Sequence, residues 1–164
     1  MCGIAGWYDI KKNLRNEITT INRMSESLSR RGPDDSGVYF NNPVCLMHRR
    51  LAVIDVENGT QPMTKCHNER TCTIVYNGEL YNTNELRNEL KGAGFTFSTS
   101  SDTEVVLASY MKWGEDCVYK LNGIFAFAVW NEDEKKLYLA RDRIGVKPLF
   151  FYEYNGGFIF ASEV

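Results

Sequence analysis

The sequence predicts an α+β fold that is built on antiparallel sheets. Short apolar runs typical of buried strands dominate both ends of the 164-residue chain, and segments with helical spacing fill its middle. Strands and helices that are separated in this way favour an α+β fold over a doubly wound parallel fold, in which the two alternate along the chain. The sequence also lacks the phosphate-loop motifs Gly-x4-Gly-Lys-Ser/Thr and Gly-x-Gly-x-x-Gly.

The first part of the chain predicts a strand, a helix and a loop. Residues 4–8 form a short apolar run suited to a buried strand. A helix is predicted over residues 17–29, because apolar side chains recur there at helical spacing: Ile18, Ile21, Met24 and Leu28. Gly32 and Pro33 then end this helix in the loop "RRGPDDSG".

Two further helices are predicted from their capping residues. Asn82 is suited to cap a helix that runs to residue 92, and Glu85, three residues later, completes a capping box. Ser101 and Glu104 repeat this spacing in front of "VVLASYMKW", which predicts a second capped helix.

The remaining apolar runs predict strands. They cover residues 44–55, 72–76, 124–130 and 137–141. The last two are joined by the polar turn "NEDEKK". At the end of the sequence, "PLFFYE" and "GFIFAS" predict a hairpin that turns through the Asn-Gly-Gly of residues 155–157.

Length and composition limit the classes of function. With 164 residues, of which 43% are hydrophobic and 13% aromatic, we expect one domain with a real core. The formal net charge is −2, from 19 basic and 21 acidic side chains without a long run of either sign, so neither nucleic acid nor a membrane surface is an expected partner. No signal peptide is visible, and no stretch approaches the roughly 20 apolar residues of a membrane-spanning helix.

The five cysteines do not follow a pattern of disulfides or metal ligands. Their number is odd and none forms a Cys-x-x-Cys pair, so neither a disulfide framework nor a four-thiolate zinc site is expected. Cys66, His67 and Cys72 are close in the sequence but lack ligand spacing, and we expect loop residues there. We therefore expect no bound metal, and a reducing cytoplasm as the compartment.

Cys2 is the residue with the clearest chemical potential. Removal of Met1 would leave a thiol and a free α-amine on one residue, and such an amine can act as the base for a nucleophile. A free α-amine titrates near about 7.7–8.0 and a thiol near about 8.5, so proton transfer between them costs only about 1 kcal/mol. If Met1 stays, the nitrogen is an amide and this base is lost. Taken alone, Cys2 fits better as a small hydrophobic residue at the start of a strand.

Further segments favour catalysis because they occur together and in order. They are "MCGIAGW", "RRGPDDSG", "HRRLAVID", "QPM", "YNGELYN", "SDTEVVLASY", "GIFAFAVWN", "RDRIGVKPLF" and "ASE". Over essentially the whole chain they resemble the glutaminase domain of glutamine-hydrolysing asparagine synthetases, a branch of the class II, N-terminal-nucleophile glutamine amidotransferases. The resemblance implies a four-layer α/β/β/α sandwich of two antiparallel sheets, of the N-terminal nucleophile hydrolase type. It also implies hydrolysis of L-glutamine to L-glutamate and ammonia through a γ-glutamyl thioester on the N-terminal cysteine.

The resemblance also assigns roles to individual residues. Cys2 is the nucleophile, and its freed amine is the general base. The side-chain amide of Asn77 and the backbone N–H of Gly78 form the oxyanion hole, since preorganised neutral donors stabilise the charge that builds on oxygen. The remaining residues bind glutamine: Arg50 holds its carboxylate, Glu79 and Asp102 hold its α-ammonium, and backbone groups between Leu51 and Ile54 line the pocket.

Local patterns leave alternatives open for these residues. Asn-Gly is also a frequent hairpin turn, so residues 77–78 could simply turn the chain. Asp102 follows Ser101 at a predicted helix start, where a negative charge is favourable by about 0.3–1 kcal/mol. Side chains on a strand alternate between faces, so at most one of Arg49 and Arg50 enters the site, and both could be solvated. We assign no catalytic role to "RRGPDDSG", "GIFAFAVW" or "RDRIGVKPLF".

The resemblance further implies a synthetase domain or chain that receives the ammonia. That domain uses ATP and Mg, so no cofactor is expected on the glutaminase domain, residues 1–164, which lacks the Ser-Gly-Gly-type ATP loop. The acceptor, aspartate or another carboxylate, is left open, as are a homodimer, the removal of Met1 and whether the chain is a natural stand-alone protein. A non-catalytic module that binds glutamine or braces a partner is the alternative function.

Overall fold

The computed structural model describes residues 1–52 and 59–164, which form strands, α-helices and short 3-10 helices. The strands are β1 (Gly3–Asp9), β2 (Asp35–Asn41), β3 (Val44–Arg50), β4 (Met63–His67), β5 (Arg70–Leu80), β6 (Gly123–Asn131), β7 (Lys136–Arg141), β8 (Phe150–Tyr154) and β9 (Gly157–Ala161). The helices are η1 (Leu14–Glu17), α1 (Ile18–Ser27), α2 (Thr83–Gly92), α3 (Asp102–Trp113) and η2 (Gly114–Tyr119). No helix in this described part of the chain is long and apolar enough to span a membrane.

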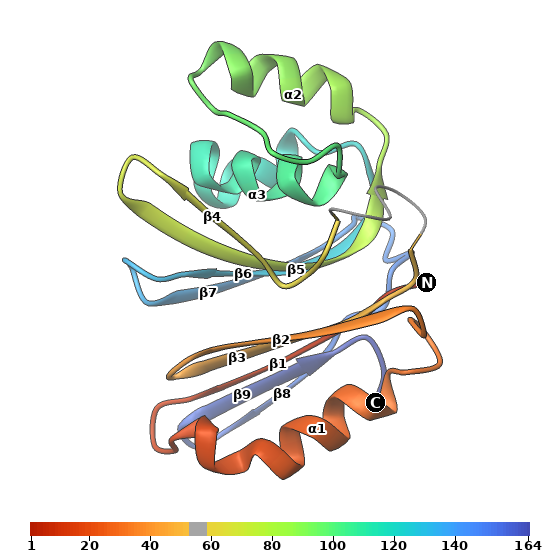
Figure 1. Ribbon diagram of the computed structural model, residues 1–164, viewed down its shortest axis with the longest axis vertical. Coiled ribbons are helices and arrows are strands. Elements are labelled where there is room, and N and C mark those ends of the chain that lie inside the picture. Colours follow the sequence, from red (N-terminus) through yellow and green to blue (C-terminus); the bar gives the residue numbers. More distant parts are fainter. Residues whose placement is uncertain (53–58) are drawn as a thin grey trace.

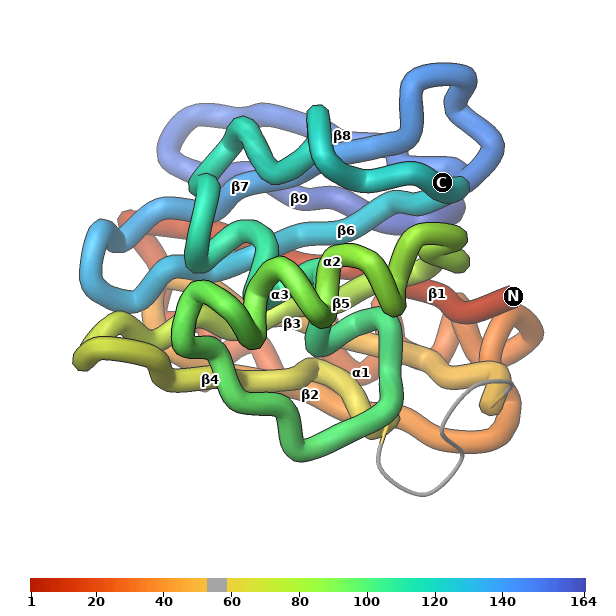
Figure 2. The backbone as a smooth tube through the Cα atoms, turned by 90° about the horizontal axis from the view of Figure 1, so that it is seen from above, coloured from red at the N-terminus to blue at the C-terminus, as the bar shows by residue number. Residues whose placement is uncertain are grey.

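The strands pair into two antiparallel sheets. One sheet has five strands in the order β2-β3-β1-β9-β8, and the other has four in the order β4-β5-β6-β7. The two sheets lie face to face, with α1 on the outer face of the five-stranded sheet and α3, then α2, on the outer face of the other (Figure 1). Seen from above, α2 and α3 lie over the strands of the four-stranded sheet (Figure 2). The α+β prediction and the implied four-layer sandwich are both confirmed.

Three apolar cores separate these four layers. Successive side chains of a strand face opposite sides of its sheet, so one strand serves two cores. Leu46 of β3 lies between the two sheets, whereas Met47 lies under α1. Ala128 of β6 likewise lies between the sheets, whereas Phe127 packs against the helices. Strands buried on both faces read as continuous apolar runs, and this is why the sequence identifies them.

Most of the predicted elements are present. The strands expected at residues 4–8, 124–130 and 137–141 are β1, β6 and β7, and the helix expected over residues 17–29 contains α1. The predicted hairpin is formed by β8 and β9, where Tyr154 pairs with Gly157 across a two-residue turn. The strand predicted over residues 72–76 is longer in the structure, since β5 runs from Arg70 to Leu80.

The sequence does not predict strands at the positions of β2 and β4. Both are edge strands, and residues of β2 such as Asp35 and Ser36 are exposed. The segments "DSGVYFN" and "MTKCH" therefore carry no continuous apolar run. Each segment forms a hairpin with the strand that follows it, and backbone pairing with β3 and β5 gives these segments their strand conformation.

The strand predicted over residues 44–55 is too long. β3 ends at Arg50, and the structure does not describe residues 53–58. Asp34 explains this end, because its N–H donates to the carbonyl oxygen of Arg50 at 3.0 Å and its carboxylate accepts from the N–H of Ala52 at 2.8 Å. The side chain of Asp34 thus binds the N–H of Ala52, a backbone group that a continuing strand would offer to its neighbour.

The predicted capping boxes are wrong in part. Asn82 precedes α2, but its side chain donates to the carbonyl of Lys120 and accepts from the N–H of Asn122, so it does not cap the helix. Ser101 does cap α3, since its hydroxyl accepts from the N–H of Thr103 at 3.1 Å. The carboxylate of Glu104 does not accept from the N–H of Ser101, as a capping box requires, because it accepts from the N–H groups of Ser98 and Thr99 instead.

Asp142 organises the loop that crosses from β7 in one sheet to β8 in the other. Its carboxylate accepts from the N–H groups of Phe125 (3.2 Å), Val146 (2.9 Å) and Lys147 (3.0 Å). Burial by itself would raise the pKa of Asp142, but these donors lower it below its ordinary value of 3.8. A carboxylate with a depressed pKa contributes stability above its ordinary pKa, and that contribution is lost as the pH falls through the folded-state value.

We therefore expect Asp142→Asn to reduce the free energy of unfolding at pH 7 by about 1–3 kcal/mol, because an amide replaces one acceptor oxygen. The variant should also lose less stability than the wild type between pH 4 and pH 2. Urea denaturation at several pH values measures both effects, with the exposed Asp116→Asn as control. Parallel pH profiles for wild type and Asp142→Asn would contradict this role.

Candidate active site

A pocket of about 300 Å³ lies where the start of β1, the end of β3, the middle of β5 and the start of α3 meet. Its lining residues are Met1, Cys2, Arg50, Leu51, Gly59, Gln61, Tyr76, Asn77, Gly78, Glu79, Ser101, Asp102, Thr103 and Lys147. The pocket thus brings together the predicted site residues that the structure describes. Ile54 lies outside the described residues.

The backbone of Leu51 holds the thiol of Cys2. Cys2 immediately precedes β1, which pairs with β3 so that Gly3 lies opposite Arg49. The N–H of Leu51 donates to Sγ of Cys2 at 3.4 Å, and the thiol faces the carbonyl oxygen of Leu51 at 3.6 Å. The sulfur is therefore placed by two backbone groups just beyond the end of β3, and Cys2 is not a core residue.

The two neighbouring arginines point to opposite faces, as strand alternation predicts. Arg49 lies on the side of α1, where it donates to the carbonyl and hydroxyl of Ser25 and forms an ion pair with Glu26 at 2.8 Å. Arg50 lines the pocket and is only 6% exposed. The alternative that both are solvated surface residues is wrong.

The segment "RRGPDDSG" braces the backbone beside the pocket. Asp35 pairs with Arg50 at the start of β2, and Arg31 donates through Nε to the carbonyl of Cys2 at 3.0 Å. Gly32 approaches β3 so closely that a Cβ atom there would lie 2.3 Å from the carbonyl carbon and oxygen of Arg49. This loop therefore supports both Cys2 and Arg50.

Asn77 and Gly78 lie in β5 and do not form a turn. They pair with Ala126 and Phe125 of β6, so the hairpin alternative is wrong. Asn77 is 2% exposed, and its amide Nδ2 is buried with no hydrogen-bond partner among the described residues. A buried amide donor is costly to leave unpaired, so an unpaired one at a pocket wall is suited to an acceptor that arrives with a ligand.

The backbone N–H of Gly78 also faces the pocket. The N–H of Tyr76 donates to Oε1 of Gln61, and the N–H of Leu80 donates to Oδ2 of Asp102, both on the edge of β5 away from β6. Backbone groups along an antiparallel strand alternate between its two edges, so the N–H of Gly78 points to the same edge between them. A Cβ at Gly78 would lie 2.6 Å from the carbonyl oxygen of Ile124, which explains the glycine.

Asp102 is fixed from β5. Its Oδ2 accepts from the hydroxyl of Tyr76 at 3.0 Å and from the N–H of Leu80 at 3.1 Å. Burial raises the pKa of Asp102 above its ordinary value, although these hydrogen bonds act against that rise. Burial and the adjacent Asp102 raise the pKa of Tyr76 well above its ordinary value, so the phenol stays a donor. A cation bound beside Asp102 would favour its ionised form.

Several pocket residues were not predicted from the sequence. Gln61 uses its side-chain amide to bind both backbone groups of Tyr76 and the hydroxyl of Thr103, and so replaces the missing end of β4. Lys147 lines the pocket, with Nζ 3.4 Å from Sδ of Met1. The segments "QPM" and "RDRIGVKPLF" marked these regions in the sequence, but nothing in their local pattern places them beside Cys2.

The described part of the chain contains no cluster of three or more His, Cys, Asp or Glu side chains arranged to hold a metal ion. The pocket offers a thiol, the guanidinium of Arg50, the ammonium of Lys147, carboxylates and neutral donors. Such a set suits a small molecule with a carboxylate, an ammonium and a reactive carbonyl.

Comparison with known proteins agrees with this arrangement. A family model described as "Glutamine amidotransferase domain" matches residues 1–164. Asparagine synthetase [glutamine-hydrolyzing] 3 of Bacillus subtilis is 55% identical over the whole chain, which covers 27% of that relative. Asparagine synthetase B of Escherichia coli is 37% identical over the whole chain, which covers 29% of it. The chain therefore spans only about a quarter of the length of these curated relatives.

Solved structures support the fold. The allosteric regulatory enzyme of purine biosynthesis matches with a TM-score of 0.78 and 22% identity, over 98% of this chain and 42% of that one. The glutamine phosphoribosylpyrophosphate amidotransferase of B. subtilis matches with a TM-score of 0.76 and 23% identity, over the same shares of the two chains. At this level of identity the likeness concerns the fold alone.

We expect Gly32→Ala to weaken the pocket as well as the fold. The added Cβ would overlap the backbone of Arg49 and could be accommodated only by moving the end of β3. The free energy of unfolding should fall by about 1–3 kcal/mol, and Cys2 should react with iodoacetamide at a changed rate. Gly92→Ala is the matched control, since nothing lies within 4 Å of a Cβ there. Equal unfolding free energies for the two variants would contradict the bracing role.

Proposed function

The chain belongs to the glutamine amidotransferase domain family, and on this premise we propose that it hydrolyses L-glutamine to L-glutamate and ammonia in the pocket around Cys2. The observation that carries the proposal is the convergence, in one pocket, of the Cys2 thiol and the buried amide of Asn77, whose Nδ2 has no partner in the described part of the chain. The first supplies a nucleophile, and the second supplies a donor for the oxygen that becomes negative when the nucleophile attacks an amide.

The reaction begins once removal of Met1 frees the α-amine of Cys2. This amine takes the thiol proton as Sγ attacks the side-chain carbonyl carbon of glutamine, and the electron pair of the C=O bond moves to oxygen. Nδ2 of Asn77 and the N–H of Gly78 stabilise that oxyanion. When it collapses, the C–N bond breaks, the ammonium of Cys2 returns a proton to the leaving nitrogen, and ammonia departs. Water then attacks the thioester, which releases glutamate and restores the thiol.

The groups that bind the α-carboxylate and the α-ammonium of the substrate would select free glutamine. Arg50 can bind its α-carboxylate through two parallel hydrogen bonds, and Asp102 with Glu79 can bind its α-ammonium. A glutamine within a polypeptide has neither charge beside its α-carbon, so it could form neither of these two contacts. The chemistry as written requires a thiol, an amine and neutral donors, so we propose no cofactor for this domain.

We further propose that the ammonia is passed to an ATP-dependent synthetase that amidates a carboxylate. The support is the similarity to proteins named as glutamine-hydrolysing asparagine synthetases, of which the chain covers about a quarter. The ATP and Mg chemistry would belong to the remaining part. A cytoplasmic location is proposed for the whole protein, because a thiol nucleophile needs a compartment that keeps it reduced. Formation of asparagine from aspartate, L-glutamine and ATP by the whole protein tests this extension.

The central test is ammonia release from L-glutamine after mass spectrometry has confirmed the loss of Met1. We expect activity in the processed chain, none in Cys2→Ala, and none in a preparation that retains Met1, because its Cys2 nitrogen is an amide. Cys66→Ala is the matched control, since Cys66 is exposed and outside the pocket. Equal rates for Cys2→Ala and the wild type would reject catalysis and leave the chain as a binding or scaffold module.

The oxyanion and carboxylate roles can be separated by kinetics. Asn77→Ala should lower kcat by about 10²–10³-fold, the usual effect of losing one oxyanion donor, with little change in KM. Arg50→Lys should raise KM by about tenfold or more, because an ammonium cannot form the paired hydrogen bonds of a guanidinium. Arg49→Lys, whose side chain faces α1, should change neither. An unchanged KM for Arg50→Lys would mean that the carboxylate partner is misassigned.

A further inference from the structure

A nearly buried ion pair beside the pocket has no part in the mechanism above. Nζ of Lys65 on β4 lies 2.8 Å from Oε1 of Glu104 on α3, and their side chains are 13% and 3% exposed. The carboxylate of Glu104 also accepts from the N–H groups of Ser98 and Thr99 and from the hydroxyl of Thr99. Burial alone would raise the pKa of Glu104, but Lys65 and these donors lower it, so the group stays ionised.

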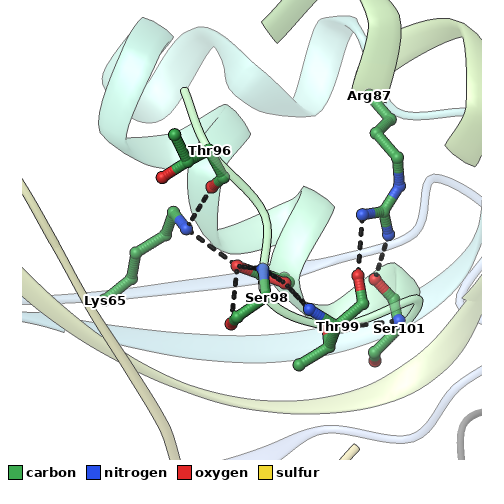
Figure 3. Close-up of polar contacts among 7 residues, drawn as sticks. Lys65, Arg87, Thr96, Ser98, Thr99 and Ser101 are labelled. Atoms are coloured by element: carbon green, nitrogen blue, oxygen red, sulfur yellow. Dashed lines mark hydrogen bonds and ion pairs between the residues drawn. The ribbon is translucent and has the colours of Figure 1, made fainter. Parts of the chain in front are cut away.

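Arg87 on α2 holds the same segment from the other side. Its guanidinium donates to the carbonyl oxygens of Thr99 at 2.8 Å and Ser101 at 2.9 Å, and Lys65 donates to the carbonyl of Thr96 at 2.6 Å (Figure 3). The ring of Phe97 lies 4.6 Å from Cζ of Arg87 and 5.3 Å from Nζ of Lys65. We call Lys65, Arg87 and Glu104 the clamp.

The clamp holds the segment that leads directly into Asp102. Ser101 and Asp102 line the pocket, whereas Lys65, Arg87 and Glu104 do not. Glu104 is buried, and Lys65 and Arg87 are half-buried. Charged groups with this many hydrogen bonds fix backbone positions, because any shift of the segment would leave a charge without its partners. The three residues come from β4, α2 and α3, so they tie the start of α3 to two other elements.

We propose that the clamp positions Asp102 for the α-ammonium of glutamine, and therefore sets the affinity for the substrate without contacting it. The inference rests on the proposed function, in which Asp102 binds that ammonium. The clamp residues are positioning residues. Asp102 is also held from β5 by Tyr76 and Leu80. If those bonds alone fixed its place, the clamp would contribute to stability only, and loss of the clamp would leave substrate affinity unchanged.

The test compares Glu104→Gln and Arg87→Lys with Asp102→Asn, all without Met1. Glu104→Gln removes the charge opposite Lys65, and Arg87→Lys replaces the rigid guanidinium fork, whose two nitrogens each hold one carbonyl, with a single flexible ammonium. For both we expect KM for L-glutamine to rise by about five- to tenfold while kcat stays within about twofold. Alkylation of Cys2 by iodoacetamide, located by mass spectrometry, should keep its wild-type rate, since that reagent has no ammonium. A general loss of structure would change both readouts.

Matched controls come from equivalent groups outside the clamp. Glu89→Gln breaks an exposed ion pair with Lys120, and Arg70→Lys alters an arginine that donates to a carbonyl at the far end of α3. Neither should change KM. The inference is overturned if the clamp variants keep the wild-type KM while Asp102→Asn raises it. An unchanged KM for Asp102→Asn would instead reject the proposed ammonium site, and the inference with it. Should Glu104→Gln not fold, Arg87→Lys decides.

Discussion

The unpaired edge of β5 is the constraint on which the site depends. β4 accompanies β5 only as far as the pair Met63 and Ile74, so beyond that point the edge of β5 away from β6 has no strand beside it among the described residues. The side-chain amide of Gln61 forms hydrogen bonds with the backbone N–H and carbonyl oxygen of Tyr76, and the carboxylate of Asp102 accepts from the N–H of Leu80. The N–H of Gly78 lies between them and faces the pocket. A sheet edge left without a partner normally invites association. Here the side chains of Gln61 and Asp102 occupy part of the edge, and Gly78 lines the pocket.

The second requirement is that the two sheets meet at one end of the sandwich. Arg50 lies in the five-stranded sheet and Cys2 immediately precedes its strand β1, whereas Asn77 and Gly78 lie in the four-stranded sheet. The proposed nucleophile and the proposed oxyanion donors are therefore brought together by the apolar core between the sheets, in which Leu46 and Ala128 lie. Rigid strands on both sides suit a reaction that needs donors in place before the charge develops.

Charged groups around the pocket are buried only where other groups compensate them. Asp142 and Glu104 accept several hydrogen bonds, and their lowered pKa values follow from these donors despite burial. Asp102 has a raised pKa, because burial outweighs its hydrogen bonds. This difference fits a division of roles in which the first two carboxylates hold the structure together, and Asp102 gains from a cation that the substrate brings.

The sequence by itself determined the class of fold, the strands that are buried on both faces, and the family. Apolar runs such as those of β1 and β6 identify a strand without knowledge of its neighbours, and the alternation of Arg49 and Arg50 follows from strand geometry alone. Cys2, Asn77, Gly78 and Asp102 were identified from motifs in order along the chain.

Only the tertiary structure decided the rest. The edge strands β2 and β4 carry no continuous apolar run and are held by backbone pairing with the buried strands β3 and β5. The caps expected of Asn82 and Glu104 are lost to partners that the capping pattern does not reveal. The clamp and the role of Gln61 likewise depend on side chains that are far apart in the sequence and meet only once both sheets and their helices have packed together.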